Sequence, residues 1–158
     1  LTKIILPKSL KKIGYGAFDR CSKLKYIEIP NSVLAIEGGA FYACEELKEI
    51  SLPSTLSKIE HSTFTSCISL RKIKIPNSVI EIGDYAFFEC KNLDEIYIPN
   101  SVIKIGRDAF SYCFNLTKVC IPKSVMEIGS DVFLECSKLR AIVIPKGTRQ
   151  RFEKTSCQ

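Results

Sequence analysis

Proline recurs at a single fixed interval along the whole chain. The seven prolines are each 23 residues apart: Pro7, Pro30, Pro53, Pro76, Pro99, Pro122 and Pro145. Leucine and phenylalanine follow the same 23-residue interval, in series that begin at Leu1 and Phe18. A constant period of roughly 20–50 residues is the signature of a solenoid, in which similar units stack on one another. The sequence therefore predicts an elongated stack rather than a globule around one central core.

The repeated unit reads L-x-x-I-x-I-P-x-S-V-x-x-I-G-x-x-A-F-x-x-C-x-x, and six full copies occupy residues 1–138. Residues 139–145 repeat the first seven positions and are expected to form a final strand. The remaining segment, 146–158, departs from the pattern. Thr148, followed by the stretch 149–154, predicts a short N-capped helix that covers the last repeat.

Residues 1–158 are expected to form a single domain. No comparable cap precedes the apolar side chains of Leu1, Ile4 and Leu6. An open apolar end is unfavourable in a solenoid, because each repeat buries its core against a neighbour. The chain is therefore expected to be a fragment of a longer array.

Each unit is expected to contain a long strand, a shorter second strand and one helical turn. In the segment L-x-x-I-x-I the apolar residues alternate, so that Ile96 and Ile98, for example, point inward. Proline then ends the strand, where a missing N–H group is tolerated. Residues 78–83 predict the shorter strand on the opposite side, and the A-F-x-x-C spacing at 86–90 predicts a helical turn.

The unit closely resembles the BspA-like, treponemal-type class of leucine-rich repeats. The residues that carry the resemblance are Leu93, Ile96, Ile98, Pro99, Ser101, Val102, Ile105, Gly106, Ala109, Phe110 and Cys113. The resemblance covers the whole chain and implies a right-handed solenoid that is mainly β. It also implies a cell-surface or secreted protein of a bacterium or protozoan, from a family in which some members bind host matrix proteins such as fibronectin or fibrinogen.

Four residues depart from the unit at two conserved-looking positions of the repeat. Glu37 and Glu60 replace the glycine, and Thr63 and Val132 replace the alanine. Because glycine permits a tight turn that other residues resist, the turn after the second strand is expected to be disturbed in these repeats.

Composition excludes several classes of protein. The net charge is +6, but Lys and Arg are interleaved with Asp and Glu, and no basic stripe with stacking aromatic residues is present. Nucleic-acid binding is therefore not expected. No apolar run approaches the roughly 20 residues that a membrane helix needs, and no membrane insertion is expected.

Eight cysteines could form a disulfide framework or bind zinc. Six of them occupy one position of the repeat: Cys21, Cys44, Cys67, Cys90, Cys113 and Cys136. Their Cα–Cβ vectors would be parallel, which favours buried free thiols over disulfides between repeats. A linear column also lacks the tetrahedral convergence of a zinc site. Cys120 and Cys157 are the candidates for exposed, reactive thiols.

No catalytic site, cofactor or metal is expected. The single histidine, His61, is predicted to be a solvated turn residue, because no partner for acid–base chemistry is evident. A column of hydroxyl residues recurs without a base and is predicted to cap turns: Ser9, Ser32, Thr55, Ser78, Ser101 and Ser124.

Variable residues on the outer face of the long strands are the strongest candidates for a binding site. A rigid frame that carries variable, aligned side chains is how solenoids build extended binding surfaces. The predicted partner-binding residues are Tyr26, Glu28, Lys72, Lys74, Glu95, Tyr97 and Lys118. The alternative is an ordinary solvated sheet. A second hypothesis places an apolar strip beside the turns, or else mutual packing next to the core, at Tyr42, Ile68, Phe88, Phe114 and Leu134.

The sequence thus favours a non-enzymatic module for protein binding or adhesion, which recognises a host or matrix protein through its long-strand face. Two alternatives remain, a structural spacer and an intracellular scaffold. Free thiols are compatible with the scaffold.

Overall fold

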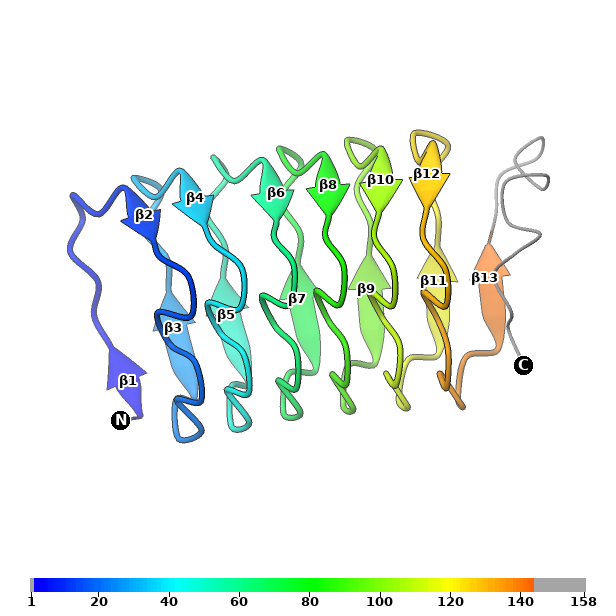
Figure 1. The fold of residues 1–158 in the computed structure, drawn as a ribbon, viewed down its shortest axis with the longest axis horizontal. Coiled ribbons are helices and arrows are strands. Elements are labelled where there is room, and N and C mark those ends of the chain that lie inside the picture. The colour runs from blue at the N-terminus through cyan, green and yellow to red at the C-terminus, as the bar shows by residue number, and fades with distance from the viewer. Residues whose placement is uncertain (1, 144–158) are drawn as a thin grey trace.

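The computed structural model describes residues 2–143 and shows an elongated β-solenoid in which strands alternate between two sides (Figure 1). The odd-numbered strands form the long-strand side: β1 (Lys3–Ile4), β3 (Tyr26–Glu28), β5 (Glu49–Ser51), β7 (Lys72–Lys74), β9 (Glu95–Tyr97), β11 (Lys118–Cys120) and β13 (Ala141–Val143). The even-numbered strands form the opposite side: β2 (Lys12–Ile13), β4 (Ala35–Ile36), β6 (Lys58–Ile59), β8 (Glu81–Ile82), β10 (Lys104–Ile105) and β12 (Glu127–Ile128).

Neighbouring strands on each side run parallel, and each residue pairs with the residue 23 positions further along. Lys72, for example, is opposite Glu95, which is opposite Lys118. The predicted inward residues are buried, including Ile96 and Ile98 at 7% and 2% exposure. The predicted β-solenoid and the alternation of its long strands are therefore confirmed.

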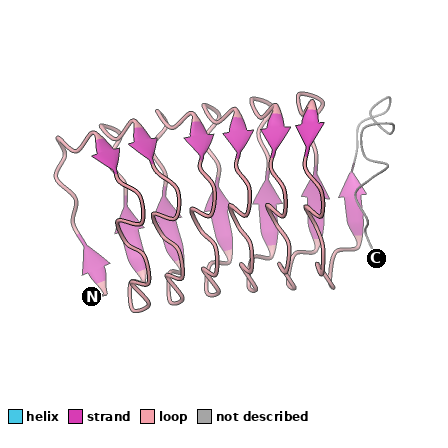
Figure 2. Ribbon diagram, in the orientation of Figure 1, coloured by secondary structure: helices cyan, strands magenta, loops and turns pink. Residues whose placement is uncertain are grey.

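The predicted helical turn is wrong, because no helix is present among residues 2–143 (Figure 2). The segment from Gly14 to Cys21 and its equivalents in later repeats, here named the turn segment, form two successive turns instead. In the first repeat, the N–H groups of Ala17, Asp19 and Cys21 donate to carbonyls three residues earlier. In a helix, successive N–H groups after the first turn all bond within the helix, and here only alternate groups bond within the segment.

The intervening N–H groups donate to the next repeat. Phe18 N donates to Ala40 O at 2.8 Å, and Arg20 N donates to Tyr42 O at 2.7 Å. Two residues per turn segment, such as Gly16 and Arg20, have positive φ, at 58° and 55°. This backbone conformation interrupts a helix and turns alternate N–H groups toward the neighbouring repeat. The predicted C-terminal helical cap, 146–158, lies outside the described residues.

Phenylalanine rings stack along the core beside the turn segments. Successive rings lie 5.2–5.8 Å apart between centroids, with interplanar angles of 3–17°. Such nearly parallel rings bury a large apolar area in each repeat. The stack comprises Phe18, Phe41, Phe64, Phe87, Phe110 and Phe133.

The cysteines that share one repeat position also form a column along the solenoid. The hydrogen bonds of their thiols explain why cysteine recurs at this position. The thiol of Cys67 donates to Phe41 O at 3.2 Å, and the thiol of Cys90 donates to Phe64 O at 3.2 Å. Cys44, Cys113 and Cys136 make the equivalent bond. These cysteines thus bond a carbonyl of the preceding repeat while filling core space as small apolar residues. The prediction of buried free thiols is confirmed for Cys44, Cys67, Cys90 and Cys113, whereas the free thiol of Cys21 is only half-buried.

Four members of the serine column, Ser32, Thr55, Ser78 and Ser101, join repeats rather than capping turns within one repeat. The buried Ser124 Oγ has no hydrogen-bond partner. Ser32 Oγ donates to Leu10 O at 2.7 Å, and Ser78 Oγ donates to Leu56 O at 2.6 Å. Ser101 Oγ donates to Val79 O at 2.6 Å. The predicted hydrogen-bonding role is thus present, but the acceptor lies 22 residues earlier, in the preceding repeat.

The hydrogen-bonded sheets on both sides of the solenoid are interrupted near β5 and β6. β5 pairs with β3 but not with β7, and β6 pairs with β8 but not with β4. Figure 1 shows a wider interval between β4 and β6 than between the other neighbouring even-numbered strands. The solenoid therefore consists of an N-terminal block that ends at Ser51 and a C-terminal block that begins at Lys58.

Turn segments carry most of the backbone hydrogen bonds between the two blocks. Within the described residues three such bonds join turn segments: Gly39 N to His61 O, Phe41 N to Thr63 O, and Ala43 N to Thr65 O. A fourth, from Ser69 N to Glu45 O, lies just beyond them. The core is continuous at this point, because Phe41 stacks on Phe64 with centroids 5.6 Å apart.

Glycine residues explain how closely the repeats approach on the short-strand side. A Cβ atom at Gly83 would lie 2.7 Å from His61 N, and one at Gly106 would lie 2.5 Å from Asp84 N. Glu60 occupies this glycine position in the third repeat and pairs with Lys58 of its own repeat at 3.1 Å. Because a side chain at this position occupies the space that glycine leaves for close approach, Glu60 is consistent with the loss of pairing between β4 and β6.

Glu37 occupies the same position without loss of pairing. Its carboxylate accepts a hydrogen bond from Tyr15 N at 3.0 Å and pairs with Lys12 Nζ at 2.5 Å. These contacts to the preceding repeat hold β4 beside β2. The expected disturbance is thus absent at Glu37, and at Glu60 it accompanies a loss of sheet pairing and not of the strand itself. Thr63 and Val132 are buried in the core.

The glycine contacts predict different outcomes for two equivalent substitutions. Gly106→Ala places a methyl group against the backbone of Gly83 and Asp84, and should lower the free energy of unfolding by about 1–3 kcal/mol because backbone cannot move aside cheaply. Gly14→Ala is the matched control, because the nearest atom to its new Cβ is Glu37 Oε2 at an ordinary 3.8 Å. Urea denaturation monitored by circular dichroism measures both. Equal stability of the two variants would contradict the steric explanation.

Burial of the thiols predicts selective alkylation of the folded protein. Burial raises the pKa of Cys67, Cys90 and Cys113 well above the ordinary value, and only the thiolate reacts with iodoacetamide. Cys120 is exposed and should be alkylated first. Peptide mass spectrometry, with Cys157→Ser to remove the tail thiol, follows each site. Alkylation of Cys90 as fast as Cys120 without denaturant would show that the column is accessible.

The same buried thiols predict a loss of stability at alkaline pH. An unfolded thiol has the ordinary pKa of 9.0, and desolvation raises the pKa of Cys44 to about 12 in the folded chain. The folded state therefore retains its protons longer, so the stabilisation is complete below pH 9 and is lost as pH rises through the folded-state pKa. Each thiol can contribute up to about 1.4 kcal/mol per pH unit.

Urea denaturation at several pH values above 9 measures this decline. A Cys67→Ala, Cys90→Ala double variant should lose stability less steeply than the parent chain, because two of the buried protons are absent. Identical slopes for the two proteins would assign the alkaline transition to other groups.

Candidate functional site

The long-strand side presents the predicted binding residues on one exposed face. In β3, β5, β7, β9 and β11 the first and third residues are exposed and the middle residue is buried. We name these exposed positions, with their equivalents in β1 and β13, the strand face. All seven predicted partner-binding residues lie on it: Tyr26, Glu28, Lys72, Lys74, Glu95, Tyr97 and Lys118.

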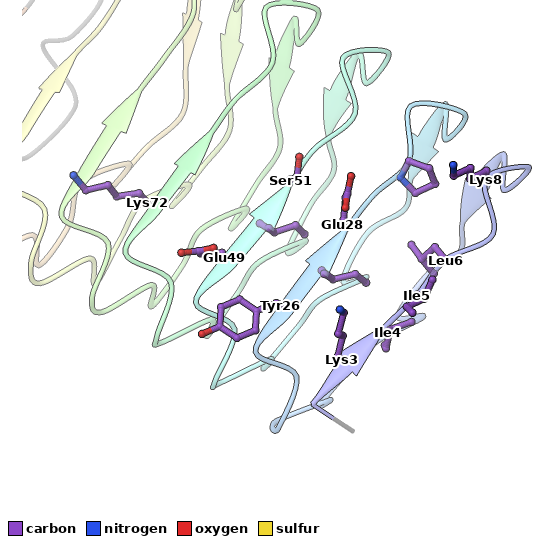
Figure 3. A pocket seen from close by; sticks show the side chains of 13 residues that line it. Lys3, Ile4, Ile5, Leu6, Lys8, Tyr26, Glu28, Glu49, Ser51 and Lys72 are labelled. Carbon is purple, nitrogen blue, oxygen red and sulfur yellow. The ribbon is translucent and has the colours of Figure 1, made fainter.

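A pocket of about 750 Å³ lies at the N-terminal end of the strand face (Figure 3). Three of the predicted residues, Tyr26, Glu28 and Lys72, line it. The rest of the lining, which includes Lys3, Ile5, Leu6, Lys8, Glu49 and Ser51, was not among the predicted partner-binding residues. Lys3, Ile5, Glu49 and Ser51 occupy the same outward positions as the predicted residues, so their repeat position was the available signal.

A second pocket, of about 470 Å³, lies where β5 and β7 are not paired. It is lined by Ser51 and Leu52 from one side and by Lys74 and Pro76 from the other. Lys74 is the one predicted binding residue in its lining. Glu95, Tyr97 and Lys118 line neither pocket and lie on the flat part of the face formed by β9 and β11.

Aromatic and charged side chains give the strand face its chemical character. Tyr26 is 46% exposed and Tyr97 64% exposed, and tyrosine combines a large apolar surface with a hydrogen-bonding hydroxyl group. Lys72 Nζ lies 3.2 Å from Glu95 Oε2, in an ion pair whose members are both solvent-exposed. Such a pair stabilises the fold little, so these charges are available to a partner.

Two of the other candidate residues, His61 and Cys120, lie within the described part of the chain. His61 is an exposed turn residue, as predicted, and its ring centroid lies 5.9 Å from that of Tyr15. Cys120 is exposed on the strand face, as predicted, and Cys157 lies outside the described residues. Across residues 2–143, no group of three or more His, Cys, Asp or Glu residues is arranged to hold a metal ion. That part of the chain also has no helix of the length and apolar character needed to cross a bilayer.

The predicted apolar strip beside the turn segments is partly covered. Tyr42 is exposed, whereas Ile68, Phe88, Phe114 and Leu134 are half-buried. Tyr112 contacts both Phe88 and Phe114, with ring centroids 5.3 and 6.1 Å apart. Mutual packing therefore accounts for much of this strip, which leaves the strand face as the better candidate site.

Comparison of the sequence with known families gives one match. The profile of the BspA type leucine-rich repeat region, in six copies, matches residues 1–113 and 57–156. Comparison with curated protein sequences gives no significant match.

Solved structures of leucine-rich repeat proteins share the fold. The leucine-rich repeat protein of T. pallidum, TpLRR, is 28% identical with a TM-score of 0.81, over 98% of this chain and 85% of that protein. A leucine-rich repeat protein of Bacteroides ovatus is 28% identical with a TM-score of 0.74, over 91% of this chain and 46% of that protein. A leucine-rich cell surface protein of Faecalibacterium prausnitzii is 20% identical with a TM-score of 0.56, over 100% of this chain and 63% of that protein.

The chain spans about half the length of the B. ovatus protein. The family profile, by contrast, covers almost the whole of the chain, and the solenoid has the parallel strands and the 23-residue register that the repeats require. The protein therefore belongs to the family of BspA type leucine-rich repeat proteins.

Proposed function

We propose that this chain is a non-enzymatic protein-binding module that recognises its partner through the strand face. The observation that carries the proposal is the register of the long strands, which aligns the exposed residues of adjacent repeats in rows. Such a face needs no conformational ordering before binding, which lowers the entropic cost of association. Leucine-rich and other solenoid repeats commonly use an extended face of this kind.

We further propose that the partner is a host extracellular matrix protein and that the module acts at a cell surface. The mixed charges and two exposed tyrosines of the strand face suit a protein ligand, because tyrosine is enriched among residues that dominate binding energy. The F. prausnitzii relative of the same fold is a cell surface protein. In this proposal the described repeats form one domain of a longer array.

An intracellular scaffold is the second candidate. The observation in its favour is the set of free thiols, including the exposed Cys120. Exposed free thiols persist more readily in a reducing compartment than outside the cell. A spacer that only projects other domains would instead leave the strand face without a partner.

Binding to immobilised fibronectin and fibrinogen tests the proposal. The parent chain should bind at least one of them. A Tyr26→Ala, Lys72→Ala, Lys74→Ala, Tyr97→Ala variant should bind at least about tenfold more weakly, because hot-spot side chains contribute roughly 1–2 kcal/mol or more each. Surface plasmon resonance measures the affinity, and circular dichroism verifies that the variant is folded.

A matched variant controls for unspecific loss of charge and aromatic surface. Tyr15→Ala, Tyr42→Ala, Lys11→Ala and Lys123→Ala remove the same residue types at exposed positions outside the odd-numbered strands. Binding by this control should match that of the parent. Equal loss in both variants would remove the strand face as the site, and no binding by the parent would contradict a matrix partner.

A further inference from the structure

Three large apolar side chains are exposed in consecutive repeats, immediately before the short strands. Ile80 is 49% exposed, Ile103 is 47% exposed and Met126 is 64% exposed. We name these three residues the apolar ladder. Exposed apolar residues that are scattered singly need no explanation, but aligned residues make a continuous stripe, and such stripes mark interaction surfaces.

Backbone hydrogen bonds hold the apolar ladder in register. Ile103 N donates to Ile80 O at 2.9 Å, and Met126 N donates to Ile103 O at 2.8 Å. The three side chains are therefore spaced at about 4.8 Å, the separation of paired strands. Ile80 N donates in turn to Ser57 O at 2.9 Å, so the stripe ends at a polar residue on its N-terminal side.

In the third to sixth repeats the residue that follows this position carries a charge, and the sign alternates from one repeat to the next. The order is Lys58, Glu81, Lys104 and Glu127, which we name the charge ladder. Lys58 Nζ lies 3.4 Å from Glu81 Oε1, and Lys104 Nζ lies 3.6 Å from Glu127 Oε2. Lys104 Nζ also lies 4.0 Å from Glu81 Oε1. These solvent-accessible pairs keep the four side chains in a row beside the apolar ladder.

The charges of the charge ladder are complementary to those of a second ladder that runs in the opposite direction. Read from Lys58 the signs are positive, negative, positive, negative, and read from Glu127 each sign is inverted. A second copy that approached in the antiparallel direction would place its Glu127 opposite Lys58, and its Lys104 opposite Glu81. The same two-fold axis would place Ile103 of that copy opposite Ile80. An isologous contact requires this self-complementarity.

We propose that the apolar ladder and the charge ladder form the interface of a homodimer, in which two copies pack antiparallel about a two-fold axis between Ile80 and Ile103. The apolar side chains form the centre of the interface. The charge ladder forms one rim, and the exposed Asn77 and Asn100 form the other. An apolar centre with a polar rim is the usual anatomy of a protein interface.

The dimer is weak and leaves the strand face free. The contact spans four repeats with one apolar or polar and one charged side chain from each, so we expect it to bury less than a standard interface, which buries about 800 Å² on each partner. Association therefore depends on concentration. The apolar ladder adjoins the even-numbered strands, on the side opposite the odd-numbered strands (Figure 1). Each dimer then presents two strand faces, and this inference stands whether or not those faces bind a matrix protein.

Sedimentation velocity over micromolar to millimolar concentrations tests the proposal, with reductant present to prevent a disulfide through Cys120. The parent chain should shift from monomer to dimer as the concentration rises. Ile103→Glu should weaken dimerisation at least about tenfold, because one substitution affects two contacts across the axis. Leu34→Glu is the matched control, since Leu34 is exposed at the equivalent position but lies in the N-terminal block.

Charge reversal tests the antiparallel direction. Glu81→Lys alone and Lys104→Glu alone should each weaken the dimer, because each places like charges opposite one another across the axis. The double variant restores opposite charges there and should recover dimerisation. Urea denaturation of each variant at low concentration separates loss of association from loss of folding.

Three results would overturn the proposal. The first is a parent chain that stays monomeric at every concentration. The second is a dimer that Ile103→Glu leaves intact or that Leu34→Glu disrupts equally. The third is a double charge variant that associates no better than the single ones, which would exclude the antiparallel arrangement.

Discussion

Alternate N–H groups of the turn segment, donated from one repeat to the next, are the interaction on which the rest of the solenoid depends. The bond from Phe18 N to Ala40 O and its equivalents recur at each junction between repeats in the described chain. They set the spacing at which phenylalanine rings stack and at which each cysteine thiol reaches a carbonyl of the preceding repeat. Sheet pairing is secondary, because it is interrupted beside β5 and β6 without interrupting the stack.

Much of this fold could be predicted from the sequence, because a repeated side-chain pattern reports directly which residues are buried. The inward direction of Ile96 and the burial of the cysteine column both follow from that pattern. The turn segment could not be predicted in the same way. Its conformation depends on backbone groups that bond to a neighbouring repeat, and the spacing of Ala86, Phe87 and Cys90 is compatible with a helical turn and with two successive turns alike.

The candidate site could be predicted only in part, for a similar reason. Alternation along a strand predicts that Tyr26 and Lys72 are exposed, and both are. A pocket depends on where neighbouring repeats separate and on what borders them, so the contribution of Leu6 and Lys8 was not evident. Glu60 was recognised as a departure from the pattern, yet its effect on strand pairing required the position of the preceding repeat.

The junction between the N-terminal and C-terminal blocks, where neighbouring strands are not paired, has a mechanical consequence. Under tension along the long axis, the two blocks are held together by the covalent chain, the core, the four backbone hydrogen bonds at or beside the turn segments and the bond from the Cys67 thiol to Phe41 O. The turn segments would then act as a hinge. The two blocks would separate at the unpaired strands, between β5 and β7 on one side and between β4 and β6 on the other. Because Ser51 and Lys72 border one pocket from opposite sides of this joint, stretching the molecule would reshape that pocket.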